Sequence, residues 1–201
     1  MHTGEIESSQ MERKTADALG EADLALLLKA VSFAAHKHRD QRRKDEIASP
    51  YINHPIAVAE VLWNTGHVRD IATIVAGILH DTIEDTETTA AELESEFGRE
   101  ICSVVGEVSD DKSLAKKERK RLQIEHARAS STRAREVKLA DKICNVTDLA
   151  TSPPANWSPE RRQEYIEWSI QVVNRLRGTN EHLERKFDEV CRRARGDTSA
   201  K

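Results

Sequence analysis

The chain has 201 residues, of which 33% are charged and 38% hydrophobic, and its formal net charge is −4. Aromatic residues make up only 4%, and glycine (8) and proline (5) are few, which argues against a turn-rich all-β fold and for long helices. No stretch approaches the roughly 18–20 apolar residues of a membrane span, and the acidic balance gives no general reason to expect a nucleic acid or a membrane as partner.

The chain divides into three segments by composition. Residues 1–21 are polar and aperiodic and predict a flexible arm, residues 22–196 carry helical patterns and form one expected domain, and residues 197–201 form an expected flexible tail. The start of the chain lacks the apolar core of a signal sequence. Three widely spaced cysteines without a CxxC pair predict reduced thiols, and these features together predict a cytoplasmic protein.

The first part of the expected domain contains two helices separated by a long charged segment. Apolar residues recur at helical spacing from Leu24 to Ala35 and predict a helix over residues 22–39. The next segment, HRDQRRKDEIASPYINHP, is long for a connection in a compact helical domain, which is typical of a functional loop. Its second proline, Pro55, suits the first turn of the helix that follows.

The middle of the sequence contains its most apolar helix. The run IATIVAGIL continues into HDTIED and predicts one helix over residues 71–85 at the centre of a bundle, with Asp70 as its N-cap. Two shorter helices are expected on either side of Gly98, which suits a helix end. A basic helix is expected over residues 114–129.

The last third of the sequence contains three further helices. Residues 132–150 predict a second central helix, which the prolines of TSPPANWSP end. Ser158 is expected to cap a helix over residues 158–178, and the last helix is expected over residues 180–195. Because the sequence shows neither a repeat nor an interdomain linker, it predicts a single all-α domain.

The dipeptide His80-Asp81 stands at the end of the most apolar run. Burying an imidazole and a carboxylate costs several kcal/mol unless they are paired or bind a metal. Glu84 and Asp85 follow one turn later, so four ionisable groups are expected at one helix end. The alternative is a helix terminus that emerges into solvent with ordinary charges. An isolated HD dipeptide favours that alternative, whereas the HDTIED cluster on a buried helix weakens it.

Two further positions complete a candidate metal site. Asp141 belongs to a polar stripe on an otherwise apolar helix, where a solvent-facing stripe is the alternative. His54 stands between an aromatic residue and a proline in PYINHP, where a capping or surface role is the alternative. Two imidazoles and two carboxylates suit a six-coordinate cation with open water positions, Mn²⁺ before Zn²⁺. Such a set would consist of His54, His80, Asp81 and Asp141.

Basic residues gather in the loop motif RRKD, in KSLAKKERKR and at the start of the helix that carries Arg161, Tyr165 and Trp168. Most of these side chains are expected to be solvated surface charges. Cations concentrated near a metal site in a protein of net charge −4 would nevertheless attract a polyanion. A phosphorylated nucleotide fits better than a nucleic acid, because few aromatic residues are available for base stacking.

Six motifs in order make the sequence resemble a known family: RRKD, PYINHP, ILHDTIEDT, SDDKSLAKKERKR, VKLADKICNV and ERRQEYIEW. They resemble the HD hydrolase domain of the RelA/SpoT homologue family, and most of all the stand-alone small alarmone hydrolases of the Mesh type. The resemblance covers residues 23–195. Each motif alone is weak, but six in the same order are highly specific.

The resemblance implies an HD-type helical bundle that removes the 3′-pyrophosphate from (p)ppGpp with Mn²⁺, giving GTP or GDP and pyrophosphate. It implies metal ligands at His54, His80, Asp81 and Asp141 and a catalytic acidic pair at Glu84 and Asp85. It implies phosphate and nucleotide contacts at Arg43, Lys44, Tyr51, Lys116, Asn145, Arg161 and Tyr165.

Two other functions stay open at this point. A related HD phosphatase that acts on the 2′-phosphate of NADPH or on another phosphoester would share the metal motifs, although RRKD and ERRQEYIEW favour the alarmone group. A non-catalytic module that binds alarmone or metal is disfavoured by the intact Glu84-Asp85 pair, because binding alone does not need it. The sequence makes no prediction of the oligomeric state.

Overall fold

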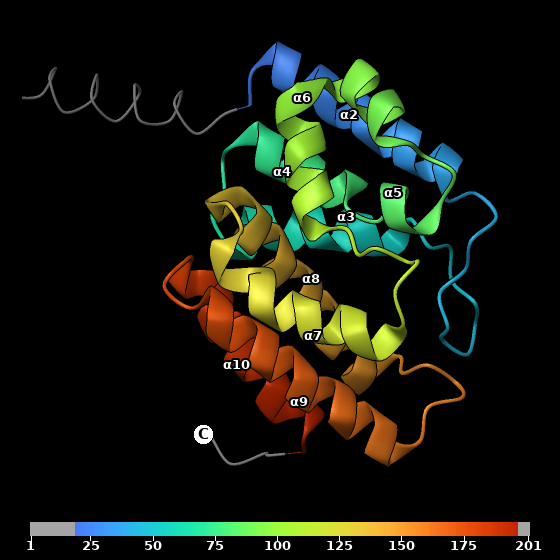
Figure 1. Ribbon diagram of the computed structural model, residues 1–201, viewed down its shortest axis with the longest axis vertical. Helices are drawn as coiled ribbons and strands as arrows, with labels where there is room; N and C mark the ends of the chain where they lie inside the picture. The colour runs from blue at the N-terminus through green and yellow to red at the C-terminus, as the bar shows by residue number, and fades with distance from the viewer. Residues whose placement is uncertain (1–18, 197–201) are drawn as a thin grey trace, which may run out of the picture.

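The structure is a computed structural model that describes residues 19–196 (Figure 1). All regular structure in that range is helical, apart from one isolated β-bridge between Arg42 and Pro50, so the all-α prediction is confirmed. Most of the expected arm (1–18) and the expected tail (197–201) lie outside the described residues. The helices are α2 (Glu21–Lys37), α3 (Asn53–Glu60), α4 (Ile71–Leu79), α5 (Thr82–Asp85), α6 (Ala90–Val108), α7 (Lys116–His126), α8 (Thr132–Thr151), α9 (Pro159–Leu176) and α10 (Glu181–Ala194).

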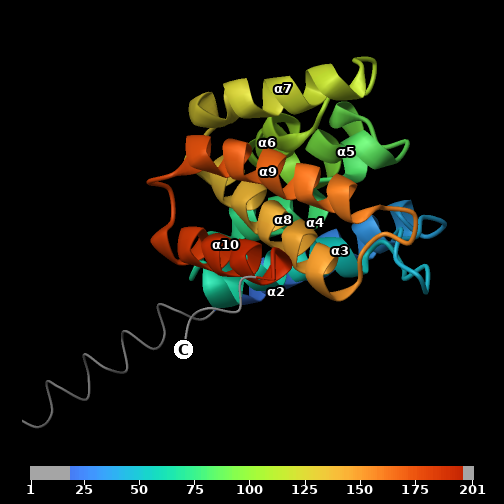
Figure 2. The same cartoon turned by 90° about the horizontal axis from the view of Figure 1, so that it is seen from below.

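Helices α4 and α8 form the centre of the bundle (Figures 1 and 2). α4 packs against α2, α3, α6 and α8, while α8 also contacts α3, α6, α9 and α10. All residues of α4 from Ala72 to Leu79 are buried, as its uninterrupted apolar run predicts. Within residues 19–196, the structure has no helix with the length and apolar character needed to cross a membrane.

Helix ends follow the capping residues of the sequence. The carboxylate of Asp70 accepts hydrogen bonds from the backbone N of Thr73 (3.0 Å) and from its hydroxyl (2.6 Å). The hydroxyl of Ser158 accepts one from the backbone N of Arg161 (3.3 Å). Gly98 has φ 82° and ψ 162°, and it separates two helical segments of α6. The predicted caps and the predicted helix end at Gly98 are thus confirmed.

The expected continuous helix over residues 71–85 is wrong at one point, because the chain leaves the helical path at His80 and Asp81. Side chains there bond to the carbonyl groups of the last turn of α4. The hydroxyl of Thr82 donates to the carbonyl of Leu79 (2.7 Å), and Nδ1 of His80 lies 2.8 Å from the carbonyl oxygen of Gly77. These local bonds satisfy the end of α4 and allow α5 to start as a separate turn.

Two long connections lie on the same side of the bundle, residues 38–52 between α2 and α3 and residues 152–158 between α8 and α9 (Figures 1 and 2). A hydrogen bond from the backbone N of Ala155 to the carbonyl of Lys44 joins them (2.9 Å). Within the first loop, the carboxylate of Asp45 accepts bonds from the backbone N (2.9 Å) and the hydroxyl (2.6 Å) of Ser49. Local bonds therefore brace the loop that the sequence marks as functional.

The burial of α4 leads to a prediction about stability. Leu79 is 0% exposed, so Leu79→Ala leaves a cavity and should lower the free energy of unfolding by about 2–5 kcal/mol, measured by urea denaturation. Leu28 on α2 is 60% exposed, and Leu28→Ala is the matched control, with an expected change of about 0.5 kcal/mol or less. Equal losses in the two variants would contradict the packing described for α4.

Candidate functional site

Four candidate metal ligands come together from three parts of the chain. His54 lies in the first turn of α3, His80 and Asp81 lie between α4 and α5, and Asp141 lies in the middle of α8. Nε2 of His54 is 3.1 Å from Oδ1 of Asp141, and Nε2 of His80 is 3.1 Å from Oδ2 of Asp81. The two cross distances, from His54 to Asp81 and from His80 to Asp141, are both 3.8 Å. We call these four side chains the ligand cluster.

The backbone orients the ring of His80. Its Nδ1 lies 2.8 Å from the carbonyl oxygen of Gly77, which only accepts, so in the neutral ring Nδ1 carries the proton and Nε2 faces the carboxylates. That Nε2 is buried and has no hydrogen-bond partner among the described residues, and the same holds for Nδ1 of His54. An imidazole held through one nitrogen, with the other turned to carboxylates, is the arrangement typical of metal sites. The residues present therefore fit a divalent cation.

The charges of the ligand cluster compensate one another. Burial would raise the pKa of Asp81, but His80 and His54 hold it far below its ordinary value. Burial would likewise raise the pKa of Asp141, and Lys142 and His54 lower it. Burial would lower the pKa of His80, yet the two carboxylates outweigh burial and raise it to about 9. Ionised carboxylates thus attract positive charge to this point, either as protons or as a cation that displaces them.

Asp85, one of the predicted catalytic acids, is fixed by side chains from outside α5. The hydroxyl of Tyr51 donates to Oδ2 of Asp81 (2.6 Å) and also lies 3.1 Å from Oδ2 of Asp85. Nε2 of Gln41 donates to the same oxygen of Asp85 (3.2 Å), and Lys112 forms an ion pair with the other oxygen. Tyr51 therefore connects the ligand cluster with the acidic pair.

Glu84, the other predicted acid, points toward α7. Its Oε2 accepts a hydrogen bond from the backbone N of Asp110 (3.1 Å), and its Oε1 lies 3.5 Å from a guanidinium nitrogen of Arg119. Burial, together with the nearby carboxylates of Asp110, Asp81 and Asp85, raises the pKa of Glu84 to about 7. A carboxyl group with this pKa can both accept and release a proton near neutral pH.

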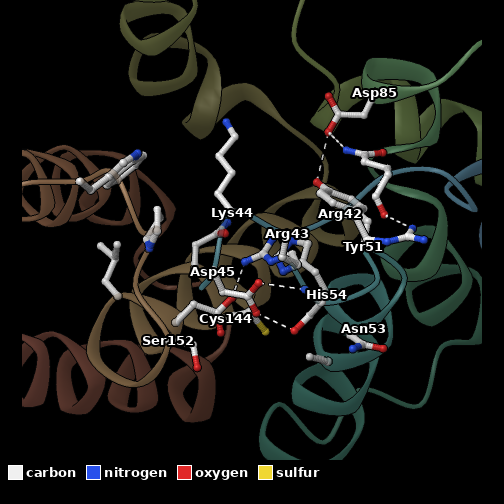
Figure 3. Close-up of a pocket in the computed structure, with 18 of the residues that line it drawn as sticks. Arg42, Arg43, Lys44, Asp45, Tyr51, Asn53, His54, Asp85, Cys144 and Ser152 are labelled. Atoms are coloured by element: carbon white, nitrogen blue, oxygen red, sulfur yellow. Dashed lines mark hydrogen bonds and ion pairs between the residues drawn. The ribbon is translucent and has the colours of Figure 1, made fainter. Parts of the chain in front are cut away.

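Two adjoining cavities open beside the ligand cluster. The first, about 590 Å³, lies between the two long connections, and we call it the loop cavity. Figure 3 shows Lys44 extending into its open space, with His54 and Asp85 at its border. The second, about 320 Å³, lies between α7, α8 and α9, and we call it the α7 cavity. Both cavities are lined by His54 and Asp85, so both border the candidate ligands and the acidic pair.

The structure brings the predicted substrate contacts to these cavities. Tyr51, Asn145 and Tyr165 line both. Arg43 and Lys44 line the loop cavity, whereas Lys116 and Arg161 line the α7 cavity. Asp81, Glu84 and Asp141 also face the α7 cavity, while His80 lies behind them and is 5% exposed. The positions are thus compatible with the expected roles, which stay predictions.

Other contacts hold the predicted basic and amide side chains in place. Arg43 forms an ion pair with Asp148, and its guanidinium carbon lies 5.7 Å from the ring centroid of Tyr51. The guanidinium of Arg161 lies 4.5 Å from the ring centroid of Trp157. Nδ2 of Asn145 donates to Oδ1 of Asp141 (2.5 Å), which connects the amide to the ligand cluster.

Several side chains at the site were missed by the sequence analysis. Lys142 is 5% exposed and donates to Oδ2 of Asp141 (3.0 Å). Its position next to Asp141 on an apolar helix was a signal that could have identified it. Lys120, on α7, lines the α7 cavity but could not be separated from its basic neighbours by sequence alone. Gln41 and Lys112 contact Asp85 from distant segments, and no local pattern indicates those contacts.

Comparison with known proteins agrees with this architecture. The model of the HD domain family matches residues 30–176. The guanosine-3′,5′-bis(diphosphate) 3′-pyrophosphohydrolase MESH1 of Xenopus tropicalis is 52% identical over 169 residues, 84% of this chain and 94% of the relative. The human protein of the same name is 53% identical over 163 residues, 81% of this chain and 91% of the relative.

Solved structures give the same result. A metazoan SpoT orthologue described as hydrolysing ppGpp superposes with a TM-score of 0.83 and 46% identity, over 89% of this chain and 98% of that one. A Listeria monocytogenes protein has a TM-score of 0.61 and 31% identity, over 75% of this chain and 97% of its own. The chain therefore belongs to the HD domain family, and within it to the group of the MESH1 proteins.

The ligand cluster leads to a prediction about metal content. His80→Ala removes a buried imidazole that faces both carboxylates and should lower the affinity for a divalent cation at least about tenfold. The metal content that remains after gel filtration, measured by elemental mass spectrometry, reports this loss of affinity. His36→Ala on the exposed side of α2 is the matched control and should retain metal as the unchanged protein does. Full metal content in His80→Ala would remove His80 from the cluster.

Proposed function

We propose that this chain hydrolyses the 3′-pyrophosphate of (p)ppGpp, giving GTP or GDP and pyrophosphate, with Mn²⁺ as its cation. The observation that carries the proposal is the convergence of the ligand cluster with Glu84 and Asp85 beside two cavities lined by basic side chains. The names of relatives that are 52% and 53% identical support the choice of substrate. A cytoplasmic location stays part of the proposal, and three free cysteines agree with it.

The ligand cluster would hold the cation through His54, His80, Asp81 and Asp141. Two imidazoles combined with two carboxylates favour Mn²⁺ over a cation that prefers oxygen ligands alone. When bound, such an ion polarises a phosphoryl oxygen and lowers the pKa of water. Asn145 and Lys142 keep the carboxylate of Asp141 in position through bonds of 2.5 Å and 3.0 Å.

Glu84 and Asp85 would orient the attacking water and take its proton. The pKa of about 7 for Glu84 suits a general base near neutral pH. The water oxygen bonds to the phosphorus attached to the ribose 3′-oxygen, and the bond between that phosphorus and the 3′-oxygen breaks. One water proton passes to Glu84 and the other stays on the pyrophosphate, while the departing 3′-oxygen takes up a proton from solvent. Asp85 is held for its part by Tyr51 and Gln41.

The loop cavity would hold the nucleoside and its 5′-phosphates. Its volume of about 590 Å³ falls within the usual range of small-molecule sites. Arg43 and Lys44 would contact phosphate from the loop, Tyr51 and Asn145 would lie beside the ribose end, and Tyr165 would close the side toward α9. Lys116 and Arg161 would contact phosphate in the α7 cavity.

The test of the function is a product assay. Purified protein with Mn²⁺ is incubated with ppGpp, and separately with NADPH, and products are separated by anion-exchange chromatography, with Asp81→Ala as control. GDP and pyrophosphate formed only by the unchanged protein are the expected result. Phosphate released from NADPH without any product from ppGpp would replace the proposal by a 2′-phosphatase. The absence of product from both substrates would favour a module that binds its ligand without catalysis.

The role of Glu84 can be tested separately. Glu84→Gln keeps the size of the side chain and removes its basicity, so kcat for ppGpp should fall about 100-fold or more while metal content stays unchanged. Steady-state kinetics and elemental analysis measure the two effects. Glu87→Gln, at an exposed residue after α5, is the matched control and should leave kcat unchanged. A kcat retained in Glu84→Gln would exclude Glu84 as the base.

A further inference from the structure

The α7 cavity contains three cations without an acidic partner. Lys116, Lys120 and Arg161 line it, and none of them forms an ion pair with a carboxylate within the described part of the chain. Two other cations of the cavity are paired, Arg119 with Glu84 at 3.5 Å and Lys142 with Asp141 at 3.0 Å. Positive charge is therefore in excess on the side of the cavity formed by α7 and the start of α9.

Trp168 holds two cations of the cavity, Lys120 and Lys142, close together. The ammonium nitrogens of Lys120 and Lys142 each lie 4.6 Å from the centroid of its ring. The indole N–H donates to the backbone carbonyl of Lys120 (3.1 Å), which fixes the ring of α9 against α7. An aromatic face attracts a cation without neutralising its charge. The ammonium group of Lys120, which has no carboxylate partner among the described residues, thus stays available to an anion, and that of Lys142 lies beside it and also pairs with Asp141.

Like charges crowd one another around Lys120. Burial lowers the pKa of Lys120, and the charge of Lys116 lowers it further; Glu164 acts in the opposite direction, and Lys142 and Arg161 add smaller lowering effects. Such a group of cations is unfavourable by itself and becomes favourable when an anion lies between its members.

The same cavity reaches the ligand cluster. His54, Asp81 and Asp141 line it together with Lys120 and Lys142, and Lys142 touches both Asp141 and Trp168. An anion in this cavity can therefore have one end at the candidate ligands and the other end at the cations on Trp168. Two linked phosphoryl groups carry two anionic ends of this kind, whereas a single phosphoryl group carries one.

We propose that Lys120 and Lys142, held on Trp168, bind the terminal phosphoryl group of the pyrophosphate that is removed. The proposal rests on the proposed function and assigns the residues that select ribose 3′-diphosphate esters over the corresponding monophosphate esters. A monophosphate at the ligand cluster leaves Lys116, Lys120 and Arg161 without an anion among them. The second phosphoryl group of a diphosphate supplies that anion.

Lys120→Met tests the proposal, because it removes the charge and keeps much of the length of the side chain. With the Mn²⁺-loaded protein, KM for ppGpp should rise about tenfold, while KM for guanosine 5′-diphosphate 3′-monophosphate stays unchanged. The inhibition constant of inorganic pyrophosphate should rise by a similar factor, and that of inorganic phosphate should not. Lys120→Arg, which keeps the charge and the contact with an aromatic face, should restore the affinity for pyrophosphate.

Lys117→Met is the matched control, since Lys117 is an exposed neighbour on the same helix and should leave all four constants unchanged. Thermal melts of each variant verify that the fold is retained. An equal rise of KM for both nucleotides, or an unchanged inhibition constant of pyrophosphate in Lys120→Met, would overturn the proposal.

Calorimetry separates this proposal from the proposed function. Binding of inorganic pyrophosphate and of inorganic phosphate to the Mn²⁺-loaded protein does not depend on turnover. If pyrophosphate binds more strongly than phosphate and this difference is lost in Lys120→Met, the role proposed for Lys120 and Lys142 is supported even without hydrolysis of ppGpp. In that case only the proposed function fails. Hydrolysis of ppGpp together with equal binding of the two anions would overturn the role proposed for Lys120 and Lys142 and leave the proposed function intact.

Discussion

Two imidazoles and two carboxylates meet inside the most apolar part of this bundle, and the need to compensate their charges shapes the structure around them. An isolated carboxylate without a partner would be costly at this depth. Asp81 and Asp141 are stabilised because His54 and His80 face them and because Lys142 lies beside Asp141. Each of these charges depends on the others, so the three chain segments that carry them must meet in one arrangement.

The path of the backbone follows from that requirement. If α4 continued without interruption, successive side chains would point in directions about 100° apart around one axis. The break after Leu79 frees His80 and Asp81 to meet His54 on α3 and Asp141 on α8. The carbonyl groups at the end of α4 accept bonds from side chains, so the break leaves them satisfied inside the core.

Much of the fold could be predicted from the sequence because it depends on local patterns. Apolar spacing located the long helices, and Asp70, Gly98 and Ser158 marked ends that the structure confirms. Two departures from regular helix were not predicted. The π-helical turn at Val61–Thr65 and the break after Leu79 stand at the ends of apolar stretches whose spacing suits a regular helix.

At the candidate site, too, the sequence indicated residues in local patterns and missed those that arrive from distant segments. His80 and Asp81 were prominent because a polar pair ends an apolar run, whereas Gln41 and Lys112 reach Asp85 only through the folded chain. The polar stripe of α8, which contains both Lys138 and Asp141, also divides in a way that its spacing does not reveal. Asp141 faces the α7 cavity, but Lys138 donates to the carbonyl of Val108 (3.3 Å) and lines a separate cavity of about 200 Å³.

Half of the eight aromatic residues of the chain lie around these cavities, and the other half pack in or against the aliphatic core. Tyr51, Trp157, Tyr165 and Trp168 all line the cavities, and cations lie over all four of these rings at 4.5–5.7 Å. A carboxylate in the same places would hold the cations equally well but would neutralise them. An aromatic face positions a cation and leaves its charge for an incoming anion. A protein of net charge −4 can thereby keep a group of cations directly beside an acidic ligand cluster.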